Sequence, residues 1–435
     1  MKILLIEQLK RPHRSSPSFI TRFLTTFSIL PTLYIRRLAA ITPSHHEVTI
    51  INERYTNLEI SDAYDLVVIH YTTPSSAYAY EIADRFRKAN TSVILCGLHA
   101  SALPNEALDH ADAVLVGRGE CNWLTALKDA EQKKLQTMYL PEPYDDTTCK
   151  IPPTSVDLPG FVMMGAVEAT RGCPYHCTFC PEGNTSYGNN FYTRPVEEVI
   201  DEIKQIPQQI IMFYDLSLTV DPEYTKELFS QMKSVHKRFF CNGNVNFLAS
   251  DLELVQLSQQ AGCIGWLVGF ESFHQATLDA IGKNTNKVAS YKKAVEFIHS
   301  HNMIVIGDFM FGFDNDTRDV FDTTLSMIKE LEIDVADFSI LTPFPGTPLF
   351  EQLQKEGRIL TTNWEQYTMF QPVFQPKQMT PEELYQGVSS LYHRFYSPKY
   401  TVNRIVQNIP RGFYPFTSAV ARNMLASFNT LFFTK

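Results

Sequence analysis

Short apolar runs alternate with amphipathic segments along almost the whole chain, and this pattern restricts the fold more than any other feature. In the N-terminal third the apolar runs are KILLIE, EVTIINE, LVVIHY, SVILCG and AVLVG, with a helical segment at residues 76–90. Short runs rich in Val and Ile are typical of parallel strands that are covered on both faces. Residues 1–135 are therefore predicted to form a doubly wound, Rossmann-like parallel sheet, a fold that binds ligands at its carboxyl edge.

A proline-rich stretch without periodicity, residues 136–160, is predicted to be a linker. Beyond it, residues 161–360 contain six more strand-like runs: GAVEAT, IIMFYD, RFFCNGN, CIGWLVGFE, IVIGDFMFGF and VADFSIL. Six strand–helix units are too few to close an eight-stranded barrel. This part is predicted to be an open, partial (β/α)6 barrel with its site at the carboxyl ends of the strands. The whole chain is thus expected to be of the α/β class.

Residues 361–435 are predicted to be a helical C-terminal extension. In TPEEL, Thr380 suits the N-cap, Pro381 the first helical position and Glu383 the third position of a capping box. The segment from Ile409 onward mixes Phe and Leu with Arg and Lys. That composition fits a helix packed over the barrel, and it also fits a helix lying on a membrane surface or on an apolar substrate.

Composition and charge restrict the class of protein further. The chain has 435 residues, is 44% apolar and carries a formal net charge of -9, so nothing in the balance indicates a nucleic-acid partner. MKILLIE passes directly into QLKRPHRSS without the features of a secretory signal, and a cytoplasmic location is expected. In a reducing compartment, eight cysteines favour metal or catalytic roles over disulfides.

Three of these cysteines, Cys173, Cys177 and Cys180, lie together in RGCPYHCTFCPEG, directly after the first barrel run. Thiolates ligate iron–sulfur clusters and structural zinc, but zinc normally takes four protein ligands and a fourth is missing locally. We interpret His176, inside the loop, as a conformational residue. Three thiolates on a four-iron cluster leave one metal position open, and an open position distinguishes a reactive site from a structural one. Zinc or a purely structural thiol cluster is the alternative.

The spacing Cys173-x3-Cys177-x2-Cys180, with Phe179 before the last cysteine, resembles the signature of the radical S-adenosylmethionine enzymes. The resemblance extends to the subgroup with an N-terminal cobalamin-binding-type domain, through ILCGLHASALPNEALDHADAVLVGRGE, QQAGCIGWLVGFESFHQATLDAIGK, VIGDFMFGFDNDT and LTPFPGTPLFEQLQKEG. It implies that the three cysteines hold a 4Fe-4S cluster and that S-adenosylmethionine occupies the fourth iron. It also implies that one electron from the cluster cleaves S-adenosylmethionine to a 5'-deoxyadenosyl radical.

The same resemblance places further residues around S-adenosylmethionine. Asp215 would bind its amino group, Glu271 its ribose hydroxyls and Asn244 its carboxylate; a carboxylate suits an ammonium. Positions expected to leave room for the cofactor are Gly269, Gly307 and Phe309. Structural alternatives stay open, because Asp215 and Glu271 could serve helix N-termini and Asn244 could simply form a turn.

Whether the N-terminal domain binds cobalamin is left open by the residues. The signature Asp-x-His-x-x-Gly is absent, so ligation by the histidine of that motif is excluded. The predicted contacts at strand ends are Thr72, Thr73, Ser75 and Gly97. Cys96 stands where the subgroup commonly has a glycine, and a vestigial sheet that only supports the barrel is the alternative. His70 and His99 are interpreted as structural residues.

The resemblance implies an enzyme that abstracts hydrogen from an unactivated carbon of a natural-product, lipid or sugar-like substrate; its catalytic side chains cannot be assigned. With cobalamin, the outcome would be C-methylation; without it, a radical cyclisation or dehydration. The expected electron donor is a flavodoxin- or ferredoxin-type protein, and a peripheral membrane contact is compatible with the C-terminal segment. A non-catalytic cobalamin or cluster sensor is the alternative from another class.

Overall fold

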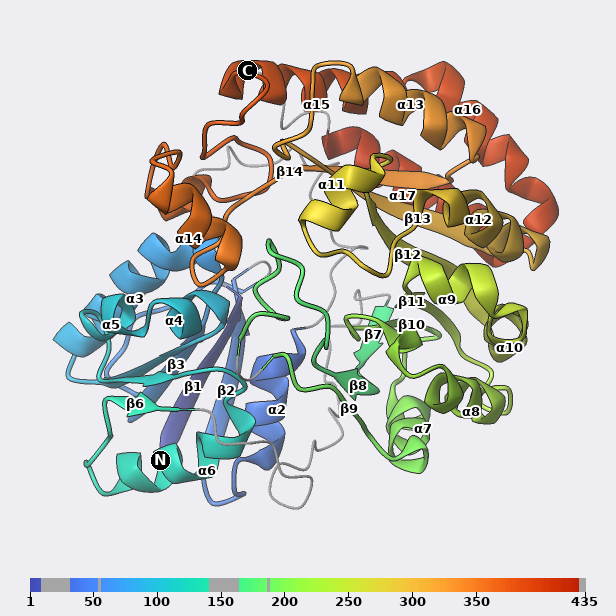
Figure 1. The fold of residues 1–435 in the computed structure, drawn as a ribbon. Helices are drawn as coiled ribbons and strands as arrows, with labels where there is room; N and C mark the ends of the chain where they lie inside the picture. The colour runs from blue at the N-terminus through green and yellow to red at the C-terminus, as the bar shows by residue number, and fades with distance from the viewer. Residues whose placement is uncertain (9–31, 54–55, 141–163, 186–187, 430–435) are drawn as a thin grey trace.

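The computed structural model describes residues 1–8, 32–53, 56–140, 164–185 and 188–429. The N-terminal part is a six-stranded sheet, in which every neighbouring pair is parallel (Figure 1). Its strands, in the order β2-β1-β3-β4-β5-β6, are β1 (Lys2–Gln8), β2 (Glu47–Asn52), β3 (Leu66–His70), β4 (Ser92–Cys96), β5 (Ala113–Leu115) and β6 (Met138–Tyr139). The helices that follow the strands are α2 (Leu33–Ile41), α3 (Ser76–Lys88), α4 (Leu98–Ala102), α5 (Pro104–Leu108) and α6 (Glu120–Glu131).

Helices cover both faces of this sheet, which explains why its strands are apolar throughout. On β1, Leu4 and Ile6 join the core under α3 and α5, while Ile3 and Leu5 join the core under α2 and α6. Successive side chains of a strand point to opposite faces, so a strand with two covered faces needs apolar residues at every position. The doubly wound architecture predicted from the sequence is confirmed.

The sheet extends beyond the predicted N-terminal boundary. Residues 138 and 139 form β6, which pairs with β5 through Val114 and Leu115. This strand has only two residues and lacks a longer apolar run, so its pattern in the sequence is too short to separate from a linker. The rest of the predicted linker, from residue 141, lies outside the described residues.

The second sheet is the predicted partial barrel. Its six parallel strands follow one another in chain order, β7 (Met164–Val167), β10 (Ile210–Phe213), β11 (Arg238–Asn242), β12 (Cys263–Glu271), β13 (Ile304–Phe311) and β14 (Val335–Ile340). Among the described residues β7 and β14 each pair with one strand only, so the barrel stays open between them. Its helices are α7 (Val196–Gln205), α8 (Pro222–Met232), α9 (Val245–Ser250), α10 (Leu252–Ala261), α11 (Gln275–Ala280), α12 (Tyr291–Ser300) and α13 (Val320–Glu330).

Alternate side chains of the barrel strands face the outer helices and the interior. On β13, Val305 and Phe309 belong to the large outer core, whereas Ile304 and Ile306 belong to a smaller interior core. The same interior core contains Ala419 of α17 (Phe413–Asn429). The last helix therefore fills the barrel at the amino ends of its strands and leaves the carboxyl ends for a site.

After the last barrel strand the chain forms α14 (Pro348–Lys355), and the C-terminal extension also contains α15 (Pro381–Phe395) and α16 (Pro398–Gln407). The predicted capping box is confirmed, since the Thr380 side chain accepts from the Glu383 amide while the Glu383 carboxylate accepts from the Thr380 amide. Trp364 of the extension donates to Glu106 of the N-terminal domain at 3.2 Å. Within the described ranges, no helix combines the length and apolar character needed to cross a bilayer.

Candidate active site

The three clustered cysteines lie on a loop framed by a small antiparallel ladder, β8 (Thr170–Arg171) with β9 (Tyr192–Thr193), at the carboxyl end of β7. Gly172 begins the loop with φ +77°, and a Cβ there would lie 1.9 Å from the Asn190 carbonyl oxygen. Only glycine fits such a turn. The loop is anchored to the barrel, because the Thr178 amide donates to the Ile281 carbonyl at 3.0 Å. The sequence therefore places the thiols on a fixed loop rather than on a free surface segment.

The environment of the three thiols suits metal-bound thiolates. Burial raises the pKa of Cys177 to about 11, and it also raises the pKa of Cys173 and Cys180. Backbone amides lower the pKa of two of these thiols. The Tyr175 amide donates to Cys173, and the amides of Glu182 and Gly183 donate to Cys180. The Lys283 ammonium adds a positive charge near all three. Thiols this buried ionise when they bind a metal, and amide donors stabilise the resulting thiolates.

The spacing of the sulfurs argues against a single metal ion. In the described part of the chain, three ligand atoms lie within 4.8 Å of one another only at His45, His46 and Glu131, on the surface of the N-terminal domain. Within the described ranges the three cysteine sulfurs therefore do not all lie within 4.8 Å of one another, and no compact set of ligand atoms of the kind that zinc takes includes them. A cluster of several irons spans such a separation, so the residues fit the iron–sulfur interpretation.

Glu271, at the end of β12, lies close to the cysteine loop. Its side chain is 2.9 Å from Lys283, and its backbone has φ +61°, a conformation that non-glycine residues rarely adopt. Gly269 makes room for this pair, because a Cβ at position 269 would lie 2.6 Å from the Glu271 carboxylate. A strained backbone and an ion pair beside the thiols support a binding role for Glu271 over a purely structural one. The ribose contact predicted for it stays a prediction.

Asn244 keeps an unpaired donor beside the cysteine loop. It stands at the N-cap position of α9, where its side chain makes no capping hydrogen bond, and it lies near Tyr175, two residues after Cys173. The Nδ2 atom is buried and donates to no acceptor in the described part of the chain. A buried donor without a partner costs about 1–3 kcal/mol. The carboxylate of S-adenosylmethionine is an acceptor of the kind that would satisfy it.

The structure gives Asp215 other partners than those predicted. Its carboxylate accepts from the amides of Ala169 and Thr170 and from the Thr170 hydroxyl, and the residue is fully buried. The predicted contact with the amino group of S-adenosylmethionine therefore finds no exposed oxygen here. Asp215 instead ties the end of β10 to the strand that leads into the cysteine loop. The structural alternative, a carboxylate at the N-terminus of the next helix, does not describe these bonds either, since Ala169 lies between β7 and β8 and Thr170 begins β8. The contact with S-adenosylmethionine stays a prediction.

Asp215→Ala is expected to weaken the cysteine loop rather than cofactor binding directly. Two buried amides would lose their acceptor, at about 1–3 kcal/mol each. The unfolding midpoint should drop, and iron loading should fall partly. Asp221→Ala is the matched control, because it removes a carboxylate that caps α8 away from the loop and should lower stability without lowering the iron content. Wild-type stability with weaker S-adenosylmethionine binding would instead identify Asp215 as a ligand.

Gly307 and Phe309, predicted to admit the adenine, point away from the barrel interior. Phe309 is 1% exposed and stacks on Phe270 in the outer core, and a Cβ at Gly307 would also meet these two rings. The sequence predicted the strand but could not show which of its alternate side chains face the barrel interior. Asp308 and Met310 have the inward orientation instead.

Sequence reasoning missed an acidic pair inside the barrel. Asp308 and Asp337 are register partners on β13 and β14, and both are partly exposed to the interior. Burial and the charge of Asp337 raise the pKa of Asp308, and burial raises the pKa of Asp337. Arg422 of α17 opposes this shift and lies over the Phe240 ring at 4.8 Å. The sequence signal that could have revealed this pair is an aspartate within an otherwise apolar strand.

A cavity of about 390 Å³ lies between the N-terminal sheet and the first barrel strands. From the sheet side it is lined by His70, Gly97 and Gly117, and from the barrel side by Glu168 and Tyr214. The cavity also reaches Glu182 of the cysteine loop, whose amide donates to Cys180. The carboxyl edge of the doubly wound sheet and the cysteine loop thus border one cavity, as expected for ligands of such sheets.

Buried charges connect the two domains at this cavity. Glu168 accepts from Arg37 at 2.8 Å and from Arg171 at 2.7 Å, and Arg171 also donates to Glu120 at 2.9 Å. Three atoms beside the cavity, Arg37 Nε, Arg118 Nη1 and Glu120 Oε2, are buried without a partner in the described residues. Buried polar atoms normally have partners, and a polar ligand in this cavity would supply them.

Of the four residues predicted to contact cobalamin, only Gly97 lines this cavity, and Thr72, Thr73 and Ser75 do not. The Thr73 hydroxyl interacts with His99, whose other ring nitrogen interacts with Glu106. Thr72 and Ser75 form a capping box with each other. The polar groups of these three residues are used in hydrogen bonds within the protein. Their position at strand ends in the sequence does not reveal these hydrogen bonds.

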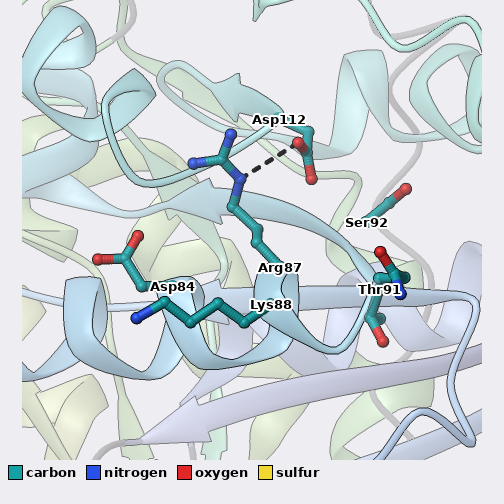
Figure 2. Close-up of a pocket in the computed structure, with 7 residues that line it drawn as sticks. Asp84, Arg87, Lys88, Thr91, Ser92 and Asp112 are labelled. Carbon is teal, nitrogen blue, oxygen red and sulfur yellow. Dashed lines mark hydrogen bonds and ion pairs between the residues drawn. The ribbon is translucent and has the colours of Figure 1, made fainter.

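A second hollow, whose lining residues are drawn in Figure 2, lies at the amino ends of the strands of the N-terminal sheet. It measures about 640 Å³ and is lined by residues at the amino ends of β4 and β5 and the end of α3, among them Arg87 and Asp112. Arg87 pairs with Asp112 at 3.3 Å, and Asp112 also accepts from the Val93 amide. Ligands of doubly wound sheets bind at the carboxyl edge. We assign this hollow no function.

Comparison with protein families agrees with the geometry. Residues 167–328 match the Radical SAM superfamily, and residues 347–432 match a domain of unknown function, DUF4070. Bacteriochlorophyllide d C-12(1)-methyltransferase of Chlorobaculum tepidum is 29% identical over 382 residues, which cover 85% of this chain and 83% of that enzyme. Anaerobic magnesium-protoporphyrin IX monomethyl ester cyclase of Cereibacter sphaeroides is 24% identical over 77% of this chain and 60% of that enzyme.

Comparison with solved structures shows that the whole architecture recurs. The radical S-adenosylmethionine methyltransferase TsrM of Kitasatospora setae, solved with cobalamin and a 4Fe-4S cluster bound, superimposes with a TM-score of 0.68. The match covers 98% of both chains at 14% identity. At that identity the likeness concerns the fold: an N-terminal sheet domain, a partial barrel and a C-terminal extension in the same arrangement.

Proposed function

We propose that this chain, which belongs to the radical S-adenosylmethionine superfamily, is a cobalamin-dependent C-methyltransferase that acts on a natural-product or lipid-like small molecule. The observation that carries the proposal is the shared cavity, because Glu182 belongs both to the cysteine loop and to the wall between the two domains. A methyl carrier held by the N-terminal sheet would thus face the substrate radical that the barrel generates. The relative with the highest identity reported above carries methyltransferase in its name.

The residues present fit the first two cofactors. Cys173, Cys177 and Cys180 would hold a 4Fe-4S cluster, and S-adenosylmethionine would bind its open iron beside Asn244 and Glu271. When bound, the cluster supplies the electron that releases a hydrogen-abstracting radical from S-adenosylmethionine. Lys283 holds positive charge next to the thiolates, and Gly269 leaves room for the Glu271–Lys283 pair beside them.

The interdomain cavity fits cobalamin in chemical character. Its wall presents the unpaired donors of Arg37 and Arg118 and an unpaired acceptor of Glu120. The rim of a corrin carries amide groups, which both donate and accept hydrogen bonds. When bound, cobalamin supplies the methyl group. Gly97 holds the turn after β4 close to Tyr71, since a Cβ there would lie 2.3 Å from the Tyr71 carbonyl oxygen.

Cofactor content is the first test of this proposal. Protein prepared without oxygen and with cobalamin supplied should contain about four irons per chain, together with one cobalamin. Incubation with S-adenosylmethionine, a reductant and substrate should give 5'-deoxyadenosine, S-adenosylhomocysteine and a product heavier by one methylene. Iron without cobalamin would contradict methyl transfer. Full cofactor content without S-adenosylmethionine cleavage would favour a non-catalytic sensor.

A radical cyclase is the second candidate, because one relative carries a cyclase name. Methylation and cyclisation leave different traces in the same reaction mixture. A cyclase would yield 5'-deoxyadenosine and a product that is lighter by hydrogen, with no S-adenosylhomocysteine. Methyl-labelled S-adenosylmethionine separates the two outcomes, since only a methyltransferase transfers the label to the product.

The electron donor proposed for the cluster is a small flavodoxin- or ferredoxin-type protein. We also propose a peripheral membrane contact through α16 and the start of α17. Val402, Val406, Ile409 and Phe413 are 57%, 52%, 57% and 73% exposed there. An apolar strip of this kind at the surface is typical of an interaction site, and a membrane would also deliver a lipid-like substrate.

Ile409→Asp combined with Phe413→Asp is expected to weaken sedimentation with anionic liposomes by about tenfold or more, because a Phe side chain that becomes buried in the membrane contributes about 1.5–3 kcal/mol. Leu252→Asp is the control, since Leu252 is 46% exposed on α10 away from the strip. Truncation of the whole segment would be unsuitable, because Ala419 of α17 belongs to the interior core of the barrel. Equal liposome binding by both variants would contradict the membrane contact.

A further inference from the structure

His70 is the last residue of β3, in the middle of the N-terminal sheet, and it lines the cavity between the two domains. Opposite it, on the barrel side, the cavity is lined by Glu168, Arg171 and Tyr214. A flat cofactor held in this cavity would turn one face to the sheet and the other to the barrel. His70 would then lie under the face that points away from the reaction.

The imidazole of His70 is neutral and has one ring nitrogen whose lone pair is free to bind a metal. Burial lowers its pKa to about 4, so the ring is neutral at physiological pH. One ring nitrogen donates to the backbone carbonyl of Glu7. A neutral imidazole has one N–H and one lone pair, so this hydrogen bond fixes the tautomer and leaves the second nitrogen as an acceptor. In the described residues, that second nitrogen has no hydrogen-bond donor.

This arrangement is the usual one for histidines that bind metals. A ligating histidine commonly donates its other N–H to a carbonyl or carboxylate, which orients the ring. Tyr34 adds a second restraint, because its ring lies 4.9 Å from the His70 ring at an interplanar angle of 30°. The Tyr34 hydroxyl is itself held by the Gly119 amide at 3.1 Å. Tyr34 covers a face of the imidazole, whereas the lone pair lies in the ring plane and stays free.

The other two candidate ligands on the sheet side are already engaged. Both ring nitrogens of His99 interact with protein partners, Thr73 at 3.2 Å and Glu106 at 3.2 Å. The Cys96 thiol is fully buried and donates to the Ile69 carbonyl at 3.5 Å. His70 alone among these three combines a free lone pair with a place on the cavity wall.

We propose that His70 is the lower axial ligand of the cobalt of a cobalamin bound in this cavity. The inference rests on the proposed function for the presence of cobalamin, and it goes beyond it in assigning a protein nitrogen to the metal. Because the ligand comes from the sheet side, the face of the cobalt toward the barrel would stay free for the methyl group. The absence of the Asp-x-His-x-x-Gly signature does not conflict with it, since His70 comes from a different strand end.

Electron paramagnetic resonance of the cob(II)alamin form tests this ligation directly. The holoprotein is prepared once with ordinary histidine and once with histidine labelled with 15N, and the cluster is kept in its diamagnetic oxidised state. Coupling to one axial 14N splits each cobalt line into a triplet, and coupling to 15N splits it into a doublet. We expect the triplet to become a doublet on labelling, and His70→Gln to remove the splitting while cobalamin remains bound.

Each other result would overturn the proposal in an identifiable way. A triplet that persists with labelled histidine would assign the nitrogen to the cofactor's own base, and a spectrum without nitrogen splitting would show that no nitrogen is bound. Protein that contains iron but no cobalamin would overturn the cofactor part of the proposed function, and the His70 assignment with it. His110→Gln is the matched control, since His110 is a half-buried histidine of the same domain that pairs with Asp84 and should leave the splitting unchanged.

Discussion

Cys177→Ala is expected to abolish cleavage of S-adenosylmethionine, with 5'-deoxyadenosine reduced at least about a hundredfold. The reason is structural, because the cluster would depend on the three thiolates of the cysteine loop, and a cluster held by two would lose iron. Iron content should therefore fall together with activity. The N-terminal sheet should stay folded, since Cys177 contacts the barrel through Gly282 and belongs to neither core of the sheet. Iron analysis and quantification of 5'-deoxyadenosine measure both effects.

Cys263→Ala is the matched control for this variant. Cys263 is a free thiol of similar burial, but it lies at the amino end of β12, far along the strand from Glu271 and the cysteine loop. Its replacement removes one small buried group, which costs about 1 kcal/mol, and should leave iron content and cleavage near wild type. Full cleavage by Cys177→Ala would refute the assignment of the cluster, whatever the control shows.

The sequence predicts the scaffold well because each strand carries its own local signal. Strands with two covered faces are apolar at every position, and the helices between them show a period of 3.6 residues. Both sheets, the open barrel and the capping box at Thr380 could be predicted on this basis. β6, with only two residues, gives no such signal.

The site could be predicted only where its residues are close together in the chain. The cysteine loop is one short motif, so its spacing could show the family resemblance that implies its chemistry. The orientation of Gly307 and Phe309 depends on which alternate positions face inward, and a strand that is apolar on both faces does not reveal this. The partners of Asp215 are about forty-five positions away in the chain, and no periodic pattern encodes such a contact.

The charge network at the domain boundary also could not be predicted, because its residues are far apart in the chain. Arg37 and Glu120 come from the N-terminal domain, and Glu168 and Arg171 from the barrel. Each residue alone looks like an ordinary surface charge in the sequence. Together they are buried, and burial is tolerated only because every charge meets an opposite one. The network therefore makes the two domains depend on each other for stability.

Glu168→Gln is expected to lower the free energy of unfolding by about 3–5 kcal/mol, because Arg37 and Arg171 would share the single charge of Glu120. The exposed fractions of the three side chains, 16% for Glu168, 7% for Arg37 and 1% for Arg171, leave little solvent to compensate. Urea unfolding midpoints of wild type and variant measure the loss. Glu223→Gln is the control, since its side chain is 86% exposed and its pairing with Lys226 is worth less than about 1 kcal/mol.

The pH dependence of that loss gives a sharper test. Burial raises the pKa of Glu168, but the charges of Arg37, Arg171 and Arg118 outweigh burial and lower it from 4.5 to about 2. A carboxylate with a lowered pKa stabilises the folded state fully above its ordinary pKa, and this stabilisation is lost as the pH falls toward the lowered value. The gap between wild type and Glu168→Gln should be full at pH values above about 5 and should narrow progressively as the pH is lowered toward 2. Iron-free protein is the material for this comparison, so that loss of the cluster does not contribute. A gap that is the same at both ends of this range would mean that the carboxylate charge of Glu168 does not hold the two domains together.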